Sequence, residues 1–185
     1  GVEAGAVRGL LVEETKSLGA ALSPAMEERL LSALGRIEAA KGWTADPAAA
    51  AALDSAAGAL REIARWYDRT PPVIQIVEPA DGAVTNDNTP FIWVTYSDAL
   101  SGVDAAAFRV SEGAVGDLTP YAAAGPAEAT LTVPDSLAFP DGRRTISARI
   151  ADMAGNGASS DSSLLVDTRP PVITVQSPAD GSVTV

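Results

Sequence analysis

The sequence predicts a multidomain protein with an α-helical segment followed by an all-β part that forms an antiparallel β-sandwich. Two observations support this fold class. Residue usage changes near Tyr67, from Ala, Leu and Glu before it to Val, Thr, Ser, Asp, Gly and Pro after Pro71, which is the usage of short strands joined by turns. In addition, the stretch that begins at Asp68 returns in altered form from Asp167, 99 residues later.

The helical segment covers residues 1–68 and contains two predicted helices, over about residues 24–41 and 47–67, with weaker helical spacing before them. Ser23-Pro24 and Asp46-Pro47 each have the form of an N-cap followed by Pro at the first helical position, and Gly42 is the expected stop of the first helix. We expect the two helices to pair as a hairpin, the alternative being assembly with a partner helix. The apolar stripes are Met26, Leu30, Leu34 and Ile37 in the first helix, and Leu53, Leu60, Ile63 and Tyr67 in the second.

The internal repeat defines the second domain. Residues 68–85 and 167–184 are identical at 11 of 18 positions, and a period near 100 residues is the size of an immunoglobulin-like β-sandwich. We therefore expect one such sandwich over residues 69–167 and the truncated start of a second repeat over residues 168–185, in a piece of a longer protein. The predicted strands are Val73–Val77, Pro90–Tyr96, the region of Phe108 and Val110, a weak edge near Tyr121, Ala129–Val133, Thr145–Ile150 and Ser163–Val166.

Composition excludes several kinds of chemistry. The chain has 24 Asp and Glu against 13 Lys and Arg, a net charge of -11, which disfavours nucleic acid and anionic membrane surfaces as partners. It has no Cys and no His, so thiol nucleophiles and imidazole bases or metal ligands are absent. No apolar run is long enough to span a bilayer, so we expect no membrane insertion in this fragment. Oxygen ligands remain, which suit calcium or magnesium.

Residues 68–185 contain a set of short motifs, namely Thr70-Pro71-Pro72, Pro79-Ala80-Asp81-Gly82, Thr85-Asn86-Asp87-Asn88-Thr89-Pro90, Tyr96-Ser97-Asp98 with Ser101-Gly102-Val103-Asp104, and Asp152-Met153-Ala154-Gly155-Asn156. Together they resemble the tandem immunoglobulin-like repeats of bacterial adhesins, stalks and secreted enzymes. The resemblance implies an extracellular or cell-surface location and contact with neighbouring repeats of the same chain, or with a cell-surface or extracellular protein or glycan. Residues 1–67 resemble, more faintly, small helical modules of secreted bacterial proteins.

Acidic clusters in loops are the candidate metal ligands. Calcium takes about six to eight oxygens, and loops of Asp, Asn and Gly supply them without distorting strands. The resemblance also implies calcium near the domain joints. Equally, these residue types favour turns for their own hydrogen bonding, so both interpretations stay open. The candidates are Asp98 and Asp104 around a Ser-Gly loop, Asp152 and Asn156 around a Met-Ala-Gly turn, and Asp68 and Asp167 before the Pro-Pro pairs.

The expected function is non-catalytic. A structural spacer, stalk or adhesive module of a large extracellular bacterial protein is the first hypothesis, and an accessory carbohydrate- or protein-binding module of a secreted hydrolase is the alternative. Trp93 in the second predicted strand is either a stacking surface for a ligand or a core anchor of the sandwich, and we expect the core. Trp43 and Trp66 are expected to pack on the hairpin or against the sandwich. No cofactor other than calcium is expected, and no catalytic residue.

Overall fold

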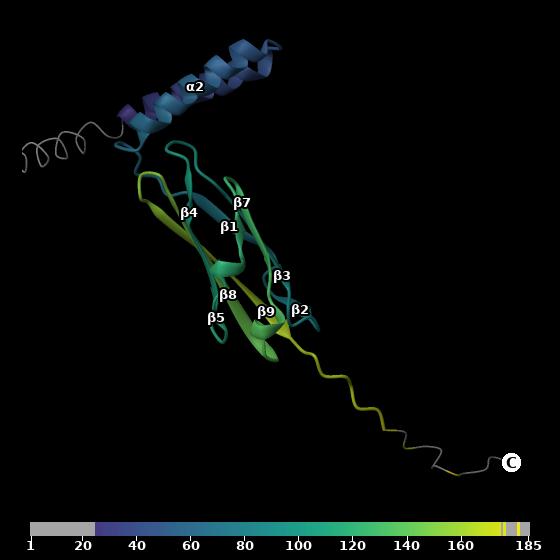
Figure 1. Cartoon of the computed structure of the whole chain (residues 1–185). Coiled ribbons are helices and arrows are strands. Elements are labelled where there is room, and N and C mark those ends of the chain that lie inside the picture. The colour runs from purple at the N-terminus through teal and green to yellow at the C-terminus, as the bar shows by residue number, and fades with distance from the viewer. Residues whose placement is uncertain (1–24, 175, 177–180, 182–185) are drawn as a thin grey trace, which may run out of the picture.

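The computed structural model describes residues 25–174, 176 and 181, and it confirms a helical hairpin followed by a two-sheet sandwich (Figure 1). The hairpin lies at one end of the sandwich, and the chain leaves after residue 166 from the opposite end. Ser23, Pro24 and the weaker helical pattern before them lie outside the described residues. No helix in the described ranges has the length and apolarity needed to cross a membrane.

The second helix, α2 (Pro47–Ala64), begins as predicted. Asp46 is its N-cap, and the Asp46 carboxylate accepts a hydrogen bond from the Ala48 N–H at 3.0 Å. Pro47 occupies the first turn, where its missing N–H costs nothing.

The C-terminal ends of the two helices differ from the prediction by two and three residues. The first helix covers residues 25–43, so it passes through Gly42, whose position leaves room for a side chain and imposes no left-handed turn. The second helix ends at Ala64 instead of Tyr67, because the N–H groups of Tyr67 and Asp68 both donate to the Ala64 carbonyl, at 2.9 and 2.8 Å. This tight turn sends the chain from the hairpin into the sandwich.

The first predicted stripe and part of the second form a small core between the helices. Leu53 and Ile63 of the second stripe lie outside this core, Ile63 being 47% exposed, and Ala57 and Ala64 fill the buried positions of that helix instead. That core includes a side chain from the sandwich, Leu100, which is 1% exposed. Trp43 and Trp66, expected to pack, are instead 87% and 79% exposed, because they lie off the stripes. The buried members are Leu30, Leu34, Ala57, Ala64 and Leu100, with Met26, Ile37, Leu60 and Tyr67 partly buried beside them.

The sandwich has a four-stranded sheet in the order β1-β3-β7-β6 and a five-stranded sheet in the order β2-β9-β8-β4-β5. Each predicted strand is present, although the region of Tyr121 is a 3-10 turn (Thr119–Tyr121) that leads into the edge strand β6. The strands are β1 (Val73–Glu78), β2 (Ala83–Thr85), β3 (Phe91–Ser97), β4 (Val103–Glu112), β5 (Gly116–Asp117), β6 (Ala123–Ala124), β7 (Glu128–Thr132), β8 (Gly142–Asp152) and β9 (Gly157–Val166).

One pairing departs from the antiparallel prediction. The short strand β2, which was not predicted, pairs in parallel with the last strand β9, with Val84 opposite Leu165. The other strand pairs are antiparallel, as in β8 and β9, which align over Gly142–Ala151. The first two strands therefore lie in different sheets: β1 belongs to the four-stranded sheet and β2 to the five-stranded sheet.

Alternating side chains of the two sheets build the sandwich core. On β3, Ile92, Val94 and Tyr96 point inward and are at most 4% exposed. Trp93 is therefore on the outer face, and the prediction of a core tryptophan is wrong: its indole N–H donates to a carboxylate oxygen of Glu128 at 2.8 Å. Strand alternation places the residue between two core positions on the opposite face, whatever its size.

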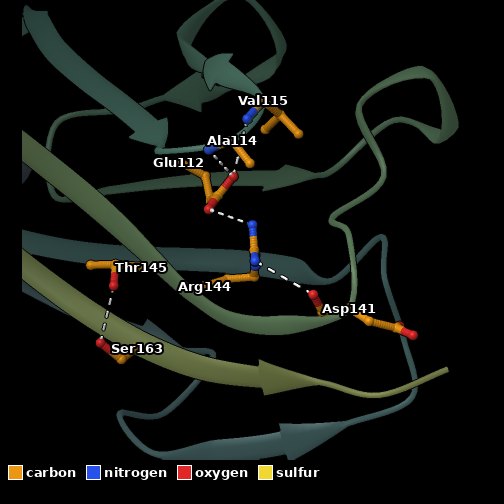
Figure 2. A network of polar contacts seen from close by, with 7 residues as sticks. All are labelled: Glu112, Ala114, Val115, Asp141, Arg144, Thr145 and Ser163. Carbon is orange, nitrogen blue, oxygen red and sulfur yellow. Dashed lines mark hydrogen bonds and ion pairs between the residues drawn. The ribbon is translucent and has the colours of Figure 1, made fainter. Parts of the chain in front are cut away.

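A buried ion pair holds the β4–β5 hairpin on β8 near the exit end (Figure 2). Glu112 is 3% exposed, and one of its carboxylate oxygens accepts from the N–H groups of Ala114 and Val115 at 2.8 and 3.1 Å. Its other oxygen lies 4.0 Å from the guanidinium of Arg144, which also donates to the Asp141 carbonyl at 3.4 Å. These contacts place Asp141 beside the departing chain.

Candidate functional site: an acidic cluster at the joint

Three loops meet where the helical hairpin joins the sandwich. They are the linker after α2, the β3–β4 loop and the β8–β9 loop, and each contributes one aspartate. Carboxylate oxygens of Asp68, Asp98 and Asp152 all lie within 4.8 Å of one another, with Asp68 and Asp152 buried and Asp98 half-buried. We call these three residues the acidic cluster.

Asp98 organises the β3–β4 loop with one of its two oxygens. That oxygen, Oδ2, accepts from the N–H groups of Leu100 and Gly102 at 2.9 and 2.7 Å. Gly102 has φ +87°, a conformation that favours glycine, so the loop can close around the carboxylate. Burial raises the pKa of Asp98 above its usual value, repulsion from Asp68 and Asp152 adds to the rise, and the two backbone hydrogen bonds oppose it.

Asp152 closes the β8–β9 loop in a similar way. Its Oδ1 accepts from the N–H groups of Ala154 and Asn156 at 2.9 and 2.8 Å, and its Oδ2 accepts from the Asn156 side-chain amide at 2.6 Å. The same amide lies 3.2 Å from the Asp68 carbonyl oxygen, to which it also donates. The Asp-Met-Ala-Gly-Asn motif therefore forms a turn that contacts the linker.

Asp68 connects the linker to the sandwich. Its Oδ1 accepts from the Thr70 N–H at 3.0 Å, and its Oδ2 accepts from the Ser101 N–H at 3.0 Å. The side chain is 3% exposed. Since hydrogen bonds to a charged group are stronger than neutral ones, Asp68 fixes the angle at which the hairpin meets the sandwich.

The structure brings together four of the six predicted ligand residues, namely the acidic cluster and Asn156. Asp104 lies outside the cluster, on β4, where it pairs with Ala151 and caps its own turn by accepting from the Ala106 N–H at 3.0 Å. Asp167 is exposed at the opposite end of the sandwich.

Sequence reasoning missed Ser101 as part of the site. Ser101 is 3% exposed, and its hydroxyl has no hydrogen-bond partner among the described residues. It belongs to the Ser-Gly loop already noted in the sequence, where it was treated only as a turn residue. A buried hydroxyl without a partner is costly, so a water molecule or a ligand at this joint would stabilise Ser101.

The donor set of the cluster fits calcium. Calcium takes about six to eight oxygen ligands in flexible geometry, whereas magnesium demands near-ideal octahedral geometry and keeps several of its waters. The carboxylate oxygens of the cluster lie within 4.8 Å of one another, and the Ser101 hydroxyl belongs to the same loop as Asp98. Within the described ranges, no Lys or Arg forms an ion pair with these carboxylates.

A second set of contacts fixes the exit of the chain. Oδ1 of Asp141 accepts from the N–H and the hydroxyl of Thr168 at 3.0 and 2.8 Å, and Oδ2 lies 2.9 Å from the guanidinium of Arg169. The hydrogen bonds from Thr168, assisted by Arg169, hold the pKa of Asp141 below its usual value. Asp141 therefore sets the direction in which the chain leaves the sandwich.

A shallow polar groove runs over the outer face of the five-stranded sheet. It encloses about 620 Å³ between strands β4, β8 and β9. Charges of both signs lie along it, and its remaining polar lining consists of serines. The charged lining residues are Arg109, Arg149, Asp117 and Asp161.

Comparison with known proteins shows that part of this chain is similar in fold to solved structures of other proteins. The chain matches no protein-family model and no curated protein sequence. Among solved structures it is similar to CopC from Methylosinus trichosporium OB3b, with 17% identity and a TM-score of 0.40 over 55% of this chain and 100% of that one. An engineered protein matches with 21% identity and a TM-score of 0.38, over 55% of this chain and 22% of the other.

A third similar structure is dimeric latent PorU from Porphyromonas gingivalis, with 22% identity and a TM-score of 0.43 over 56% of this chain and 11% of that one. The chain thus matches less than a quarter of PorU and of the engineered protein. At such identities and TM-scores, these likenesses concern the β-sandwich alone and say nothing of function.

Proposed function

We propose that this chain is a non-catalytic spacer of stalk or adhesive type in a large extracellular bacterial protein, with a calcium-binding joint at its entrance. The observation that carries the proposal is the placement of the two joints. The chain enters the sandwich at Asp68 and leaves it near Asp167 at the other end, and carboxylate contacts pin it at both places (Figure 1). Modules joined in this way line up head to tail.

The chemistry of the described residues supports a structural role. The oxygens of Asp68 and Asp152 are taken by hydrogen bonds that shape loops, and Asp98 uses one oxygen in the same way. Such hydrogen bonds disfavour protonation of these acids, although each carboxylate oxygen keeps a second lone pair that a cation can use. With no Cys or His in the sequence, the usual nucleophiles and bases are absent as well.

Calcium has a clear physical role at the joint. Three carboxylates gathered in a partly buried site repel one another, and a divalent cation offsets that repulsion while linking three separate segments. The ion would be held by the acidic cluster and Ser101, with water completing its shell. Its effect is to stiffen the joint between the hairpin and the sandwich.

Thermal unfolding of the full chain with calcium, with magnesium or with chelator tests this proposal. A free calcium concentration about 100-fold above Kd stabilises the folded state by about 2.7 kcal/mol, which raises Tm by several degrees. The key variant is Asp98→Asn. Since both loop hydrogen bonds go to one oxygen of Asp98, the Asn carbonyl keeps them, while the ligand charge is lost.

Asp104→Asn is the matched control, because it removes an acid on the neighbouring strand outside the cluster. We expect the calcium-dependent rise in Tm to disappear in Asp98→Asn and to persist in Asp104→Asn. Equal responses of the two variants, or no response of the unaltered chain to calcium, would contradict calcium binding by the cluster.

The alternative function, an accessory ligand-binding module, is favoured by the groove on the five-stranded sheet. Its paired arginines and serines offer hydrogen-bond donors to a glycan or peptide. Screening the full chain against glycans and extracellular proteins, with Arg149→Ala as the groove variant, distinguishes the two functions. Binding that is lost in Arg149→Ala but indifferent to calcium would replace the spacer proposal.

A further inference from the structure

The exit from the sandwich repeats the local geometry of its entrance. At the entrance, Oδ1 of Asp68 accepts from the Thr70 N–H at 3.0 Å. At the exit, Oδ1 of Asp167 accepts from the Arg169 N–H at 3.1 Å. These positions correspond in the internal repeat, and a Pro-Pro pair follows each turn directly. The same turn therefore precedes both copies of the repeated segment.

The two aspartates differ in their second oxygen. Oδ2 of Asp68 accepts from the Ser101 N–H inside a buried joint. Asp167 is exposed, and its Oδ2 has no hydrogen-bond partner in the described part of the chain. In the described part of the chain, Oδ2 of Asp167 is thus free to accept a hydrogen bond, whereas Oδ2 of Asp68 already accepts one from Ser101.

The residues after Asp167 show the same contrast. Pro72 is buried and Ile74 packs against the sandwich core, whereas the corresponding Pro171 and Ile173 are exposed, Ile173 by 84%. Apolar side chains that are covered in the first copy lie open in the second. What covers them in the first copy is the sandwich into which that segment leads.

We infer that Asp167 is the docking group for the entrance end of the following sandwich, a second copy of this fold that begins at residue 168. Its Oδ2 accepts from the backbone N–H of that copy that corresponds to Ser101 N–H. This inference rests on the proposed spacer function, and it names the partner and the contact that determine how successive modules are joined.

The exit contacts prepare Asp167 for this role. Asp141 holds both Thr168 and Arg169, so the turn that carries Asp167 is fixed on the sandwich before any partner is present. The prolines that follow restrict the backbone further. Because the docking segment is already ordered, docking loses little conformational entropy.

Amide hydrogen exchange followed by NMR tests the inference, in the full chain and in the full chain extended by residues 87–166 of its own first repeat. The extension completes the second copy, because Val185 corresponds to Asn86. In the extended chain, Asp167→Asn should speed exchange of the second-copy amide that corresponds to Ser101 by about tenfold or more. At the entrance the two N–H groups bond to different carboxylate oxygens, and an Asn offers an acceptor oxygen at only one of these two places.

Asp68→Asn in the unextended chain is the matched variant, and it should speed exchange of the Ser101 amide by a similar factor. Asp167→Asn should leave the Ser101 amide unchanged in both chains. If the first extension does not fold, residues 68–166 repeated directly after Val166 replace it, again with Asp at position 167.

The outcomes separate this inference from the proposed function. An extended chain with a folded second copy whose exchange ignores Asp167→Asn overturns the docking contact and leaves the spacer function standing. If Asp68→Asn leaves exchange of the Ser101 amide unchanged, the docking contact is also overturned, because that contact is inferred from the bond between Asp68 and Ser101 at the entrance. Specific ligand binding by the groove, as described above, contradicts the spacer function. The exchange rates in Asp167→Asn still decide whether the docking contact forms.

Discussion

Leu100 links the stability of the helical hairpin to the sandwich. It belongs to the β3–β4 loop, yet it is 1% exposed because it packs among the hairpin residues Leu30, Leu34, Ala57 and Ala64. Three leucines supply most of the apolar volume in that small core. Replacing Leu100 with Ala therefore removes a large share of what holds the helices in place.

The expected loss is about 2 to 5 kcal/mol, the range for a buried Leu→Ala change. Two helices without the support of a larger core are marginal in water, so a loss of this size exceeds what the hairpin can tolerate. We expect the helices to unfold at lower urea concentration than the sandwich. The sandwich core contains none of the atoms removed and should keep its own midpoint.

Urea unfolding followed by far-ultraviolet circular dichroism and by NMR amide signals resolves the two transitions. Leu31→Ala is the matched control, because Leu31 is 39% exposed on the same helix and Ala is the better helix former; we expect a change within about 0.5 kcal/mol. Leu118→Ala, at a fully buried sandwich position, should shift the sandwich transition. A Leu100→Ala protein whose helices keep their midpoint would refute the packing argument.

Three further predictions concern hydrogen bonds and pH. Asp152→Ala leaves three donors of a buried loop without their acceptor and should cost about 3 kcal/mol in urea unfolding, whereas Asp104→Ala loses one exposed bond and should cost under about 1 kcal/mol. Tyr96→Phe removes the hydroxyl that lies 2.8 Å from the carbonyls of Gly125 and Glu128 and should cost about 1 kcal/mol by the same assay. Folding lowers the pKa of Asp141, so the stability from its contacts is complete above about pH 3.9, the pKa of an aspartate in the unfolded chain. That stability is lost as the pH falls through the lower pKa of the folded protein. NMR titration of the Asp141 carboxyl should give a midpoint below that of an ordinary aspartate.

Local signals in the sequence were sufficient for the main elements. The Asp46-Pro47 cap and the helical stripes depend on residues a few positions apart, so they were visible without knowledge of the fold. The internal repeat gave the size of the sandwich. The region after Pro79 was different: β2 is three residues long and its partner β9 is some 80 residues away, so no local pattern identifies it.

The sequence predicts where a strand lies more easily than it predicts which side chains of that strand face the core. On β3, apolar residues occupy both phases of the alternation, and the usual role of a buried tryptophan as the anchor of such sandwiches led to the prediction that Trp93 is inside. The structure gives the core to Ile92, Val94 and Tyr96, since these meet the opposite sheet. Only the packing of two sheets, which involves distant residues, decides between the two phases.

The acidic cluster was partly visible for a similar reason. Turn-forming acids at the ends of strands predict loops, and Asp98 and Asp152 follow β3 and end β8 at one end of the sandwich. Asp104 is also a turn-forming acid, but it lies on β4 opposite Ala151 and therefore outside the cluster. Ser101 could have been included only with the knowledge that the hairpin covers its loop and buries its hydroxyl.

The parallel pairing of β2 with β9 affects how the molecule responds to tension. Pulling the two ends of the sandwich apart draws β9 along its own length past β2. The hydrogen bonds between Ala83–Thr85 and Leu164–Val166 are therefore strained together rather than one after another. Bonds loaded in parallel share the force, and rupture requires their simultaneous loss. This strand of three residues thus adds a second sheared contact to β9, beside the long pairing of β9 with β8.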